Sequence, residues 1–255
     1  MTDGLEGGAH GPDAHVPSMH RAARAEDALH EFLEPRLRQR GWRDTIVAYA
    51  GYGSPSWVRV MARLLLRKPE QQPARVHAVR GWRSFATLPV TDETVVIEVG
   101  DRRHEVRTDR GGYIDAVVDA DLQPGWRSVR LYRSGAEPVE APVRILDPDL
   151  RFAVVSDIDD TVMVTALPRP LLAAWNTFVL DEYARSPVPG MAVLYERLVT
   201  AHPDAPVFYL STGAWNVAPA LTRFLSRNLY PSGPLLLTDW GPTIDRWFRS
   251  GEIHK

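Results

Sequence analysis

The sequence predicts an α/β domain with a parallel sheet, preceded by a small β-sandwich-like domain. Between residues 45 and 145, short apolar runs with the two-residue period of strands are separated by Gly, Pro and Asp. Beyond residue 150 the pattern becomes strand, helix, strand, helix, strand, which is typical of a parallel sheet covered by helices. A chain of 255 residues is long enough for both domains.

The composition is that of a soluble globular protein, with 44% hydrophobic and 24% charged residues. The net charge is −2, and neither half of the chain is basic, so no nucleic-acid partner is expected. The absence of cysteine excludes disulfides, thiolate metal sites and cysteine nucleophiles. There is no signal-peptide pattern, and no run approaches the roughly 18 apolar residues of a transmembrane helix. A cytoplasmic protein is the simplest interpretation.

The N-terminal region is expected to be a tail followed by a helix. Residues 1–18 are rich in Gly, His, Asp and Pro, which predicts a disordered tail. Residues 19–41 predict an amphipathic helix that ends at Gly41. Its other face is rich in arginine, which suits either a solvated face beside the next domain or transient contact with a membrane surface. The apolar positions at helical spacing are Ala25, Leu29, Phe32, Leu33 and Leu37.

Residues 42–147 predict the β-sandwich-like domain, and Asp147-Pro148-Asp149 predicts a linker. Asp101–Arg102 and Asp109–Gly112 are expected to be hairpin connections. This half has no cluster of catalytic residue types, so we expect it to be non-catalytic or to present substrate. The predicted strands are Thr45–Ala50, Trp57–Leu66, Val95–Val99, His104–Thr108, Tyr113–Val118, Ser128–Arg133 and Val143–Leu146.

Residues 150–255 predict the α/β domain. In parallel sheets the ligand lies beyond the carboxyl ends of the strands, so chemistry is expected at Asp157, Ser211 and Asp239. In the predicted helix Gly190–Ala201, the side chains expected to face inward are Val193, Leu194, Leu198 and Val199. The predicted strands are Phe152–Ser156, Val207–Leu210 and Leu235–Thr238, and the predicted helices are Gly190–Ala201 and Val217–Asn228.

The densest group of chemically active residues is Asp157-Ile158-Asp159-Asp160-Thr161, directly after the first of these strands. Three carboxylates within four positions repel one another unless a cation is present. A hard ion such as Mg²⁺ prefers oxygen ligands of this kind. An acidic turn that holds no ion is the alternative.

This segment resembles the Asp-x-Asp-x-Thr motif of haloacid-dehalogenase-type phosphatases. Together with Tyr209–Asn216 and Leu237–Gly241, it resembles the catalytic domain of the actin-patch phosphatidate phosphatase family, over about residues 150–255. The upstream helix and sandwich are similar to the amino-terminal region of bacterial members. The resemblance implies a haloacid-dehalogenase-like parallel sheet with flanking helices and Mg²⁺-dependent hydrolysis of a phosphate monoester, with phosphatidate as substrate.

The resemblance also implies a role for each residue of the site. Asp157 would attack phosphorus and form an aspartyl-phosphate, and Asp159 would transfer protons to the leaving group and from water. Mg²⁺ would bind the Asp157 carboxylate and the Asp159 main-chain carbonyl. Thr161 would stabilise the loop by hydrogen bonding. Lys255 would offset phosphate charge, with a frayed terminal residue as the alternative.

A second group of residues follows the next strand. The superfamily places a phosphate-binding hydroxyl at the position of Ser211, and backbone N–H groups around Thr212 and Gly213 would help to hold the anion. Asn216 either contacts substrate or satisfies backbone groups near the helix start, and both interpretations stay open.

The family pattern continues beyond its lysine to a Gly-Asp-Ser-Gly-like segment whose acid completes the metal site. The sequence ends before such a segment, so we expect the phosphatase domain to lack its C-terminal part and a third metal ligand. Two alternatives remain beside a phosphatidate phosphatase. One is a phosphatase of a soluble phosphate ester, and the other is a catalytically incomplete binding or interaction module.

Overall fold

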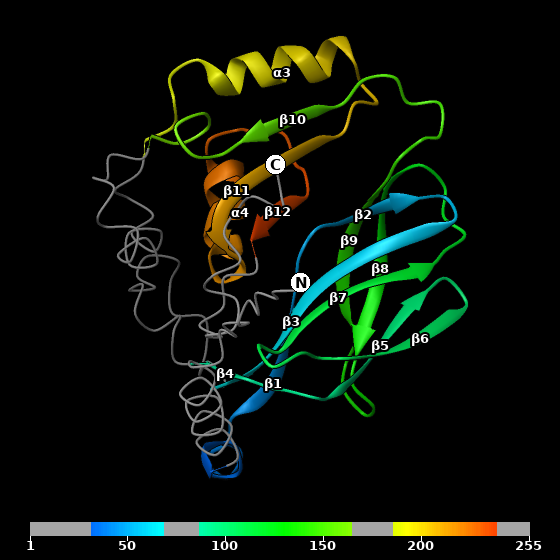
Figure 1. The fold of residues 1–255 in the computed structure, drawn as a ribbon, viewed down its shortest axis with the longest axis vertical. Helices are drawn as coiled ribbons and strands as arrows, with labels where there is room; N and C mark the ends of the chain where they lie inside the picture. Colours follow the sequence, from blue (N-terminus) through cyan, green and yellow to red (C-terminus); the bar gives the residue numbers. More distant parts are fainter. Residues whose placement is uncertain (1–31, 69–86, 165–185, 239–255) are drawn as a thin grey trace, which may run out of the picture.

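The computed structural model describes residues 32–68, 87–164 and 186–238, arranged as Figure 1 shows. The predicted tail, residues 1–18, lies outside the described residues. The first two described segments build a β-rich unit, and the last one builds most of an α/β unit beside it. The prediction of a β-rich part followed by an α/β part is therefore confirmed.

Within the described residues, the strands of the β-rich unit form one sheet that bends back on itself. β3 pairs with β1, β2, β4 and β7, whereas β2 also pairs in parallel with β9, and the sheet continues through β8 and β5 to β6. The short β2 thus joins two halves of the sheet. One half consists of β1, β3, β4 and β7, and the other consists of β5, β6, β8 and β9. The strands are β1 (Arg43–Ala48), β2 (Gly51–Ser54), β3 (Trp57–Arg67), β4 (Leu88–Pro89), β5 (Thr94–Val99), β6 (Arg102–Arg107), β7 (Tyr113–Asp119), β8 (Gly125–Tyr132) and β9 (Val139–Ile145).

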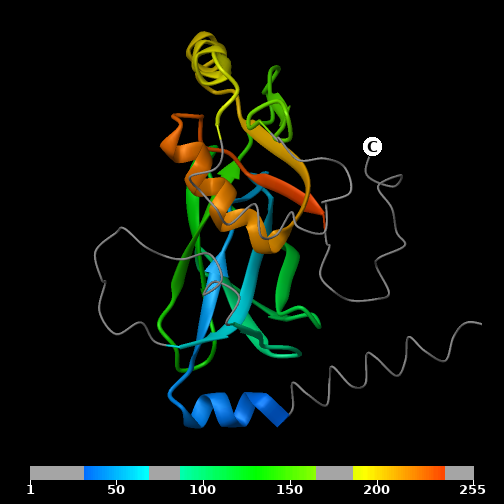
Figure 2. The ribbon, with the colours of Figure 1, turned by 90° about the vertical axis from the view of Figure 1, so that its left-hand side faces the viewer.

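The two halves enclose one apolar core, and Figure 2 shows them from the side. Successive side chains of a strand point to opposite faces, so alternate residues of β5, β8 and β9 enter this core. Each fully buried aliphatic side chain contributes about 1.5–3 kcal/mol to folding. The largest fully buried members are Leu64, Leu66, Ile97, Ile114, Leu131 and Ile145.

One of the two predicted hairpins is present. β5 and β6 pair antiparallel, with Val99 opposite Arg102. Asp109–Gly112 is also a turn, because the N–H of Gly112 donates to the Asp109 carbonyl at 2.9 Å. However, the strands on either side of it do not pair with each other, since β7 pairs with β3. The prediction of a hairpin there is wrong, because this turn carries the chain from one half of the sheet to the other.

Residues 32–39 are helical, and the rest of the predicted helix 19–41 falls mostly outside the described residues. Leu33 and Leu37 pack against the β-rich core as expected. Phe32 was expected on the same apolar face, but its side chain is 55% exposed. No helix in the described part of the chain is both long and apolar enough to cross a membrane.

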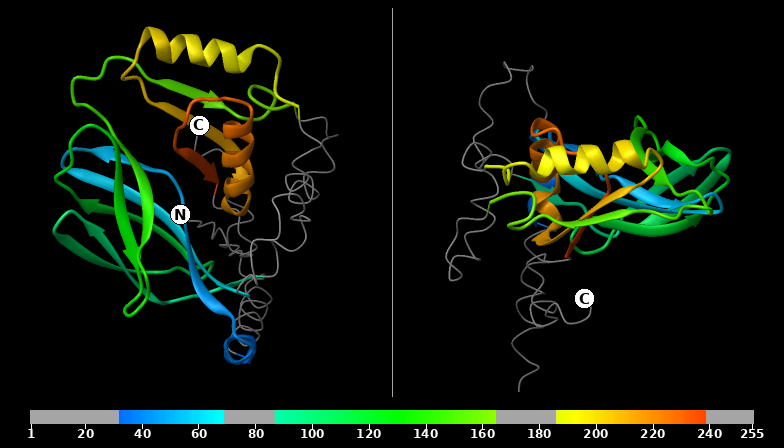
Figure 3. Two further views of the ribbon diagram at one scale, coloured as in Figure 1. Left: turned by 180° about the vertical axis from the view of Figure 1, so that it is seen from behind. Right: turned by 90° about the horizontal axis from the view of Figure 1, so that it is seen from above.

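The α/β unit is a three-stranded parallel sheet in the order β10-β11-β12, seen from two further directions in Figure 3. α3 lies beside β10, and α4 lies beside β11 and β12 (Figure 1). Alternate residues of β10 and β11 are buried with both helices in one core, whereas Val155 and Leu210 on the opposite face are 62% and 37% exposed. The elements are β10 (Val154–Asp157), α3 (Met191–Ala201), β11 (Val207–Ala214), the 3₁₀ turn Trp215–Val217, α4 (Ala218–Arg227) and β12 (Leu235–Thr238).

The buried face of α3 differs from the predicted one. Val193 and Leu194 are 52% and 46% exposed, so the prediction that they face inward is wrong. Leu198 and Val199 do pack against the core. The helix is rotated so that Tyr195 is buried, and its hydroxyl reaches the Ser156 hydroxyl of β10 at 2.5 Å. Tyr195, Leu198 and Val199 therefore belong to the face of the helix that meets the sheet.

Candidate active site

The predicted nucleophile, Asp157, is the last residue of β10, and its side chain is exposed. The preceding Ser156 is buried on the opposite side of the strand, because side chains alternate along it. Parallel pairing sets Asp157 opposite Leu210 of β11. The carboxylate thus lies at the carboxyl end of the sheet, where the sequence predicts chemistry.

The loop after β10 is closed by main-chain hydrogen bonds. The N–H of the fully buried Ile158 donates to the Leu210 carbonyl at 2.9 Å. The Ile158 carbonyl in turn accepts from the N–H groups of Val162 and Met163 at 3.0 and 3.1 Å. Thr161 is half-buried within this turn. The loop geometry therefore rests on the backbone and on the buried side chains of Ile158, Val162 and Met163.

Asp160 occupies the left-handed backbone region, with φ of 59°. Few residue types adopt this conformation, and Asp and Asn are among those that do. Its N–H donates to the Met163 carbonyl at 2.9 Å, and its side chain is exposed. The Asp160 backbone therefore takes part in closing the turn.

Asp159 is hydrogen-bonded to Ser211, the first residue of the predicted phosphate-binding group. The Ser211 hydroxyl donates to Oδ2 of Asp159 at 3.0 Å, and Ser211 itself is buried. The contact follows from the parallel register, because the residues just past Asp157 meet those just past Leu210. Two residues more than fifty positions apart in the sequence therefore share one hydrogen bond.

The segment after Ser211 leaves the regular sheet. Pairing between β11 and β12 shifts between Ser211 and Ala214, so Thr212 and Gly213 have no regular partners on β12. The Gly213 N–H donates to the Ser211 hydroxyl oxygen at 3.0 Å. This N–H was expected to help hold an anion, but here it fixes Ser211. Asn216 follows in the 3₁₀ turn and is half-buried.

Thr238, at the end of β12, was given no role from the sequence. Its hydroxyl contacts the carbonyls of Thr212 and Gly213 at 2.7 and 3.3 Å. It therefore holds the irregular part of β11 from the side of β12. The signal for it was a hydroxyl residue at the carboxyl end of the third strand.

Two buried tyrosines donate hydrogen bonds to main-chain carbonyls of the α/β unit. The Tyr230 hydroxyl donates to the Val162 carbonyl, and the Tyr209 hydroxyl donates to the Pro231 carbonyl, at 2.9 and 2.7 Å. Burial raises the pKa of both tyrosines above the ordinary value, because the charged phenolate would lose its hydration. Both hydroxyls therefore stay protonated at neutral pH and remain donors.

The structure thus brings Asp157, Asp159 and Ser211 to one edge of the sheet, with Gly213 bonded to Ser211. Lys255 and Asp239 lie outside the described residues. In the described segments, no three His, Cys, Asp or Glu side chains are grouped closely enough to hold a metal ion. Any ion at this edge would therefore be held by two carboxylates at most from these segments.

Comparison with known families agrees with this geometry. Residues 152–255 match the family model described as phosphatidate phosphatase APP1, catalytic domain. The resemblance inferred from the motifs is therefore confirmed over this segment, and it indicates a phosphatase enzyme. No curated protein matches the chain significantly.

Proposed function

Because residues 152–255 match the model of the phosphatidate phosphatase APP1 catalytic domain, we propose that the protein is a Mg²⁺-dependent phosphate-monoester hydrolase of haloacid-dehalogenase type. The proposed substrate class is a phosphatidate-like lipid phosphate. The observation that carries the proposal is the 3.0 Å hydrogen bond from Ser211 to Asp159, beside the exposed Asp157 at the end of the neighbouring strand.

In the first proposed step, a carboxylate oxygen of Asp157 attacks phosphorus, and the bond from phosphorus to the leaving oxygen breaks. Asp159 gives its proton to that oxygen, so the alcohol leaves neutral. In the second step, water attacks phosphorus while Asp159 takes its proton. The bond between Asp157 and phosphorus then breaks, which releases inorganic phosphate and restores both carboxyl groups.

Ser211 has a single O–H to donate, and here Asp159 accepts it. A bound phosphate would compete for that donor, since its oxygens are strong acceptors. We therefore assign Ser211 two successive roles, orienting Asp159 in the free enzyme and binding a phosphate oxygen in the complex. Thr212 and Asn216 follow Ser211 in the same segment and are proposed to contact substrate.

The donor set fits Mg²⁺, which proteins hold through one or two carboxylates together with water and substrate phosphate. Asp157 and the main-chain carbonyl of Asp159 are the proposed ligands. When bound, Mg²⁺ supplies positive charge that reduces the repulsion between a carboxylate nucleophile and a phosphate. Lys255 is proposed to offset the remaining negative charge on the phosphate.

The test measures phosphate release from phosphatidate in mixed micelles and from glycerol phosphate in solution. Phosphate release is expected from phosphatidate in the micelles. This release should vanish in EDTA and return when Mg²⁺ is added. Asp157→Asn should lower turnover by about 10³-fold or more, because no covalent intermediate can form. Asp160→Asn is the matched control, since Asn also adopts the left-handed conformation, and turnover should stay within about twofold.

Faster release from glycerol phosphate than from phosphatidate would replace the lipid substrate by a soluble ester. Full activity in EDTA, or in Asp157→Asn, would contradict the mechanism itself. Binding of inorganic phosphate without any hydrolysis would favour the third interpretation, a binding module with an incomplete site.

A further inference from the structure

The β-rich unit contacts β11, the strand that carries Ser211, and the residues just before and after it at three points. Before the strand, Nη2 of Arg144 donates to the Asp204 carbonyl at 2.9 Å. Within the strand, the rings of Tyr52 and Phe208 meet edge to face, with centroids 5.5 Å apart. These contacts come from β9 and β2 of the β-rich unit.

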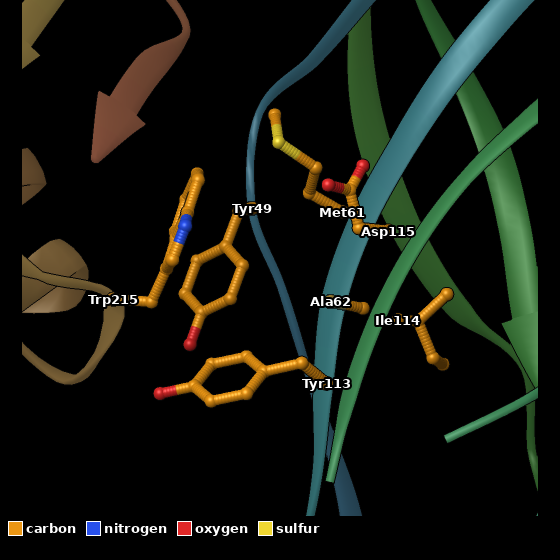
Figure 4. A pocket seen from close by; sticks show the side chains of 7 residues that line it. All are labelled: Tyr49, Met61, Ala62, Tyr113, Ile114, Asp115 and Trp215. Atoms are coloured by element: carbon orange, nitrogen blue, oxygen red, sulfur yellow. The ribbon is translucent and has the colours of Figure 1, made fainter. Parts of the chain in front are cut away.

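The third contact lies just past the strand and is the most buried. Figure 4 shows the ring of Tyr49 beside the indole of Trp215, and their centroids are 4.9 Å apart. Both side chains are only 8% exposed. The N–H of Tyr49 donates to the Met61 carbonyl at 2.9 Å, which ties Tyr49 to the long strand β3. Trp215 therefore rests on a part of the β-rich unit that is itself fixed.

These aromatic residues form a packed contact and not a ligand pocket. The cavity between Tyr49, Tyr113 and Trp215 has a volume of about 10 Å³. A volume of that size holds about one water molecule. The carboxylate of Asp115 also borders it, but that carboxylate is paired with Arg59 through two hydrogen bonds of 2.6 Å.

Trp215 belongs to the segment from Ser211 to Asn216, in which the pairing with β12 holds only Ser211 and Ala214. The register of β11 and β12 shifts between Ser211 and Ala214, so Thr212 and Gly213 have no regular partners on β12. Thr238 holds their carbonyls from the side of β12. On the far side of the segment, Trp215 is held by Tyr49.

We infer that the β-rich unit positions the phosphate-binding segment, and that Tyr49 is its positioning residue, acting through Trp215. The inference rests on the proposed function of Ser211 and deepens it. Tyr49 touches no reacting atom. Its ring limits where Trp215 can lie, and thereby where Ser211, Gly213 and Asn216 stand relative to Asp157. Misplacement of catalytic groups by 1 Å costs about 10²-fold in rate, so loss of the contact between Tyr49 and Trp215 should slow the reaction.

The experiment uses the full chain with Tyr49→Ala, Tyr49→Phe and Leu131→Ala. The first variant removes the ring, and the second removes only the hydroxyl. Leu131 is fully buried in the separate core of the β-rich unit, so Leu131→Ala loosens that unit without touching β11. All measurements are made at a temperature at which thermal melts show each variant folded.

The first readout is the inhibition constant of inorganic phosphate against hydrolysis. Tyr49→Ala should raise it about tenfold, with a fall in kcat, because both Ser211 and the Asp159 that it orients are displaced. Tyr49→Phe should stay within about twofold of wild type, and so should Leu131→Ala. Equal phosphate inhibition in Tyr49→Ala and Leu131→Ala would overturn the inference, as would a Tyr49→Phe variant as impaired as Tyr49→Ala.

The second readout is amide hydrogen exchange of residues 211–216, which needs no activity. Exchange there should be faster in Tyr49→Ala than in Leu131→Ala. If the wild type hydrolyses no phosphate ester, the proposed function fails, while exchange still decides whether the β-rich unit holds the segment. Unchanged exchange in Tyr49→Ala overturns the inference whatever the activity.

Discussion

Asp157 and Asp159 are two positions apart but have different surroundings. Asp157 is exposed at the end of β10, where a substrate can reach it from solvent. Asp159 is half-buried, and Ser211 fixes the direction of its carboxylate. A nucleophile has to be reachable, whereas a group that transfers protons in two successive steps has to be aimed. The two environments suit the roles proposed for Asp157 and Asp159.

Two buried serines provide a matched test of whether Ser211 acts in the site or only stabilises the sheet. Ser156 and Ser211 are 4% and 6% exposed, lie on adjacent strands, and each bonds one side chain. Each serine hydroxyl makes two hydrogen bonds, so either change to alanine should destabilise the fold by about 1–3 kcal/mol. Only Ser211→Ala should also lower kcat/KM, by about 10²-fold, as expected for loss of one donor at a reacting phosphate.

Urea denaturation and steady-state kinetics on both variants check this expectation. A similar loss of kcat/KM in Ser156→Ala would show that the effect comes from general loosening of the sheet. An unimpaired Ser211→Ala variant would remove Ser211 from the site.

At the scale of elements, the strands of the α/β unit were predictable because each is a short apolar run bounded by turn residues. Parallel strands end at the same edge, which was enough to bring Asp157 and Ser211 together from sequence. β2 and β4 were not predicted. β2 is Gly-Tyr-Gly-Ser, which lacks the apolar alternation of a strand, and one of its two partners, β9, is distant in sequence.

The turn before β12 should be sensitive to a single methyl group. A Cβ at Gly233 would lie 2.0 Å from the Val207 carbonyl oxygen, where the backbone of β11 begins. Gly233→Ala should therefore displace β12 and lower the free energy of unfolding by about 1–3 kcal/mol, as overpacking does. Urea denaturation measures this loss.

Gly135→Asn is the control for that change. Gly135 has φ of 78° with no atom within 4 Å of an added Cβ, and Asn tolerates this conformation. Its stability should change by less than about 0.5 kcal/mol. Equal stability of the two variants would show that the turn at Gly233 moves freely away from β11.

At the scale of the whole molecule, the contact between the two units could not be predicted from the sequence. Tyr49 and Trp215 lie in different predicted domains, and no pattern in the sequence relates one to the other. The structure places Tyr49 and Met61 of the β-rich unit in the same apolar core as Trp215 and Leu221 of the α/β unit. Only tertiary packing decides such a pairing.

The stability of the whole molecule should fall at alkaline pH. Burial raises the pKa of Tyr49, Tyr209 and Tyr230 in the folded state, whereas unfolded tyrosines ionise near pH 10. Above about pH 10 the unfolded chain therefore releases protons that the folded chain keeps. The contribution of each tyrosine to stability is complete below that pH, and it declines as pH rises toward the raised folded value.

Each buried tyrosine should make the free energy of unfolding fall by up to about 1.4 kcal/mol per pH unit above pH 10. Tyr49→Phe removes one such group, so its stability should fall less steeply than that of wild type. Urea denaturation at several pH values between 9 and 11.5 provides the comparison. Parallel curves for the two proteins would show that Tyr49 ionises equally in both states.

The three contacts along β11 also bear on the order in which the protein folds. Every partner of β11 in the β-rich unit precedes it in the chain, so a ribosome makes that surface first. Hairpins such as β5–β6 close over short loops, whereas β10 has to find β11 across about fifty residues, which is slower. Domains generally fold as units during synthesis, N-terminal part first. We therefore expect the β-rich unit to be folded, with its contact surface for β11 formed, while β11 is still pairing with β10 and β12.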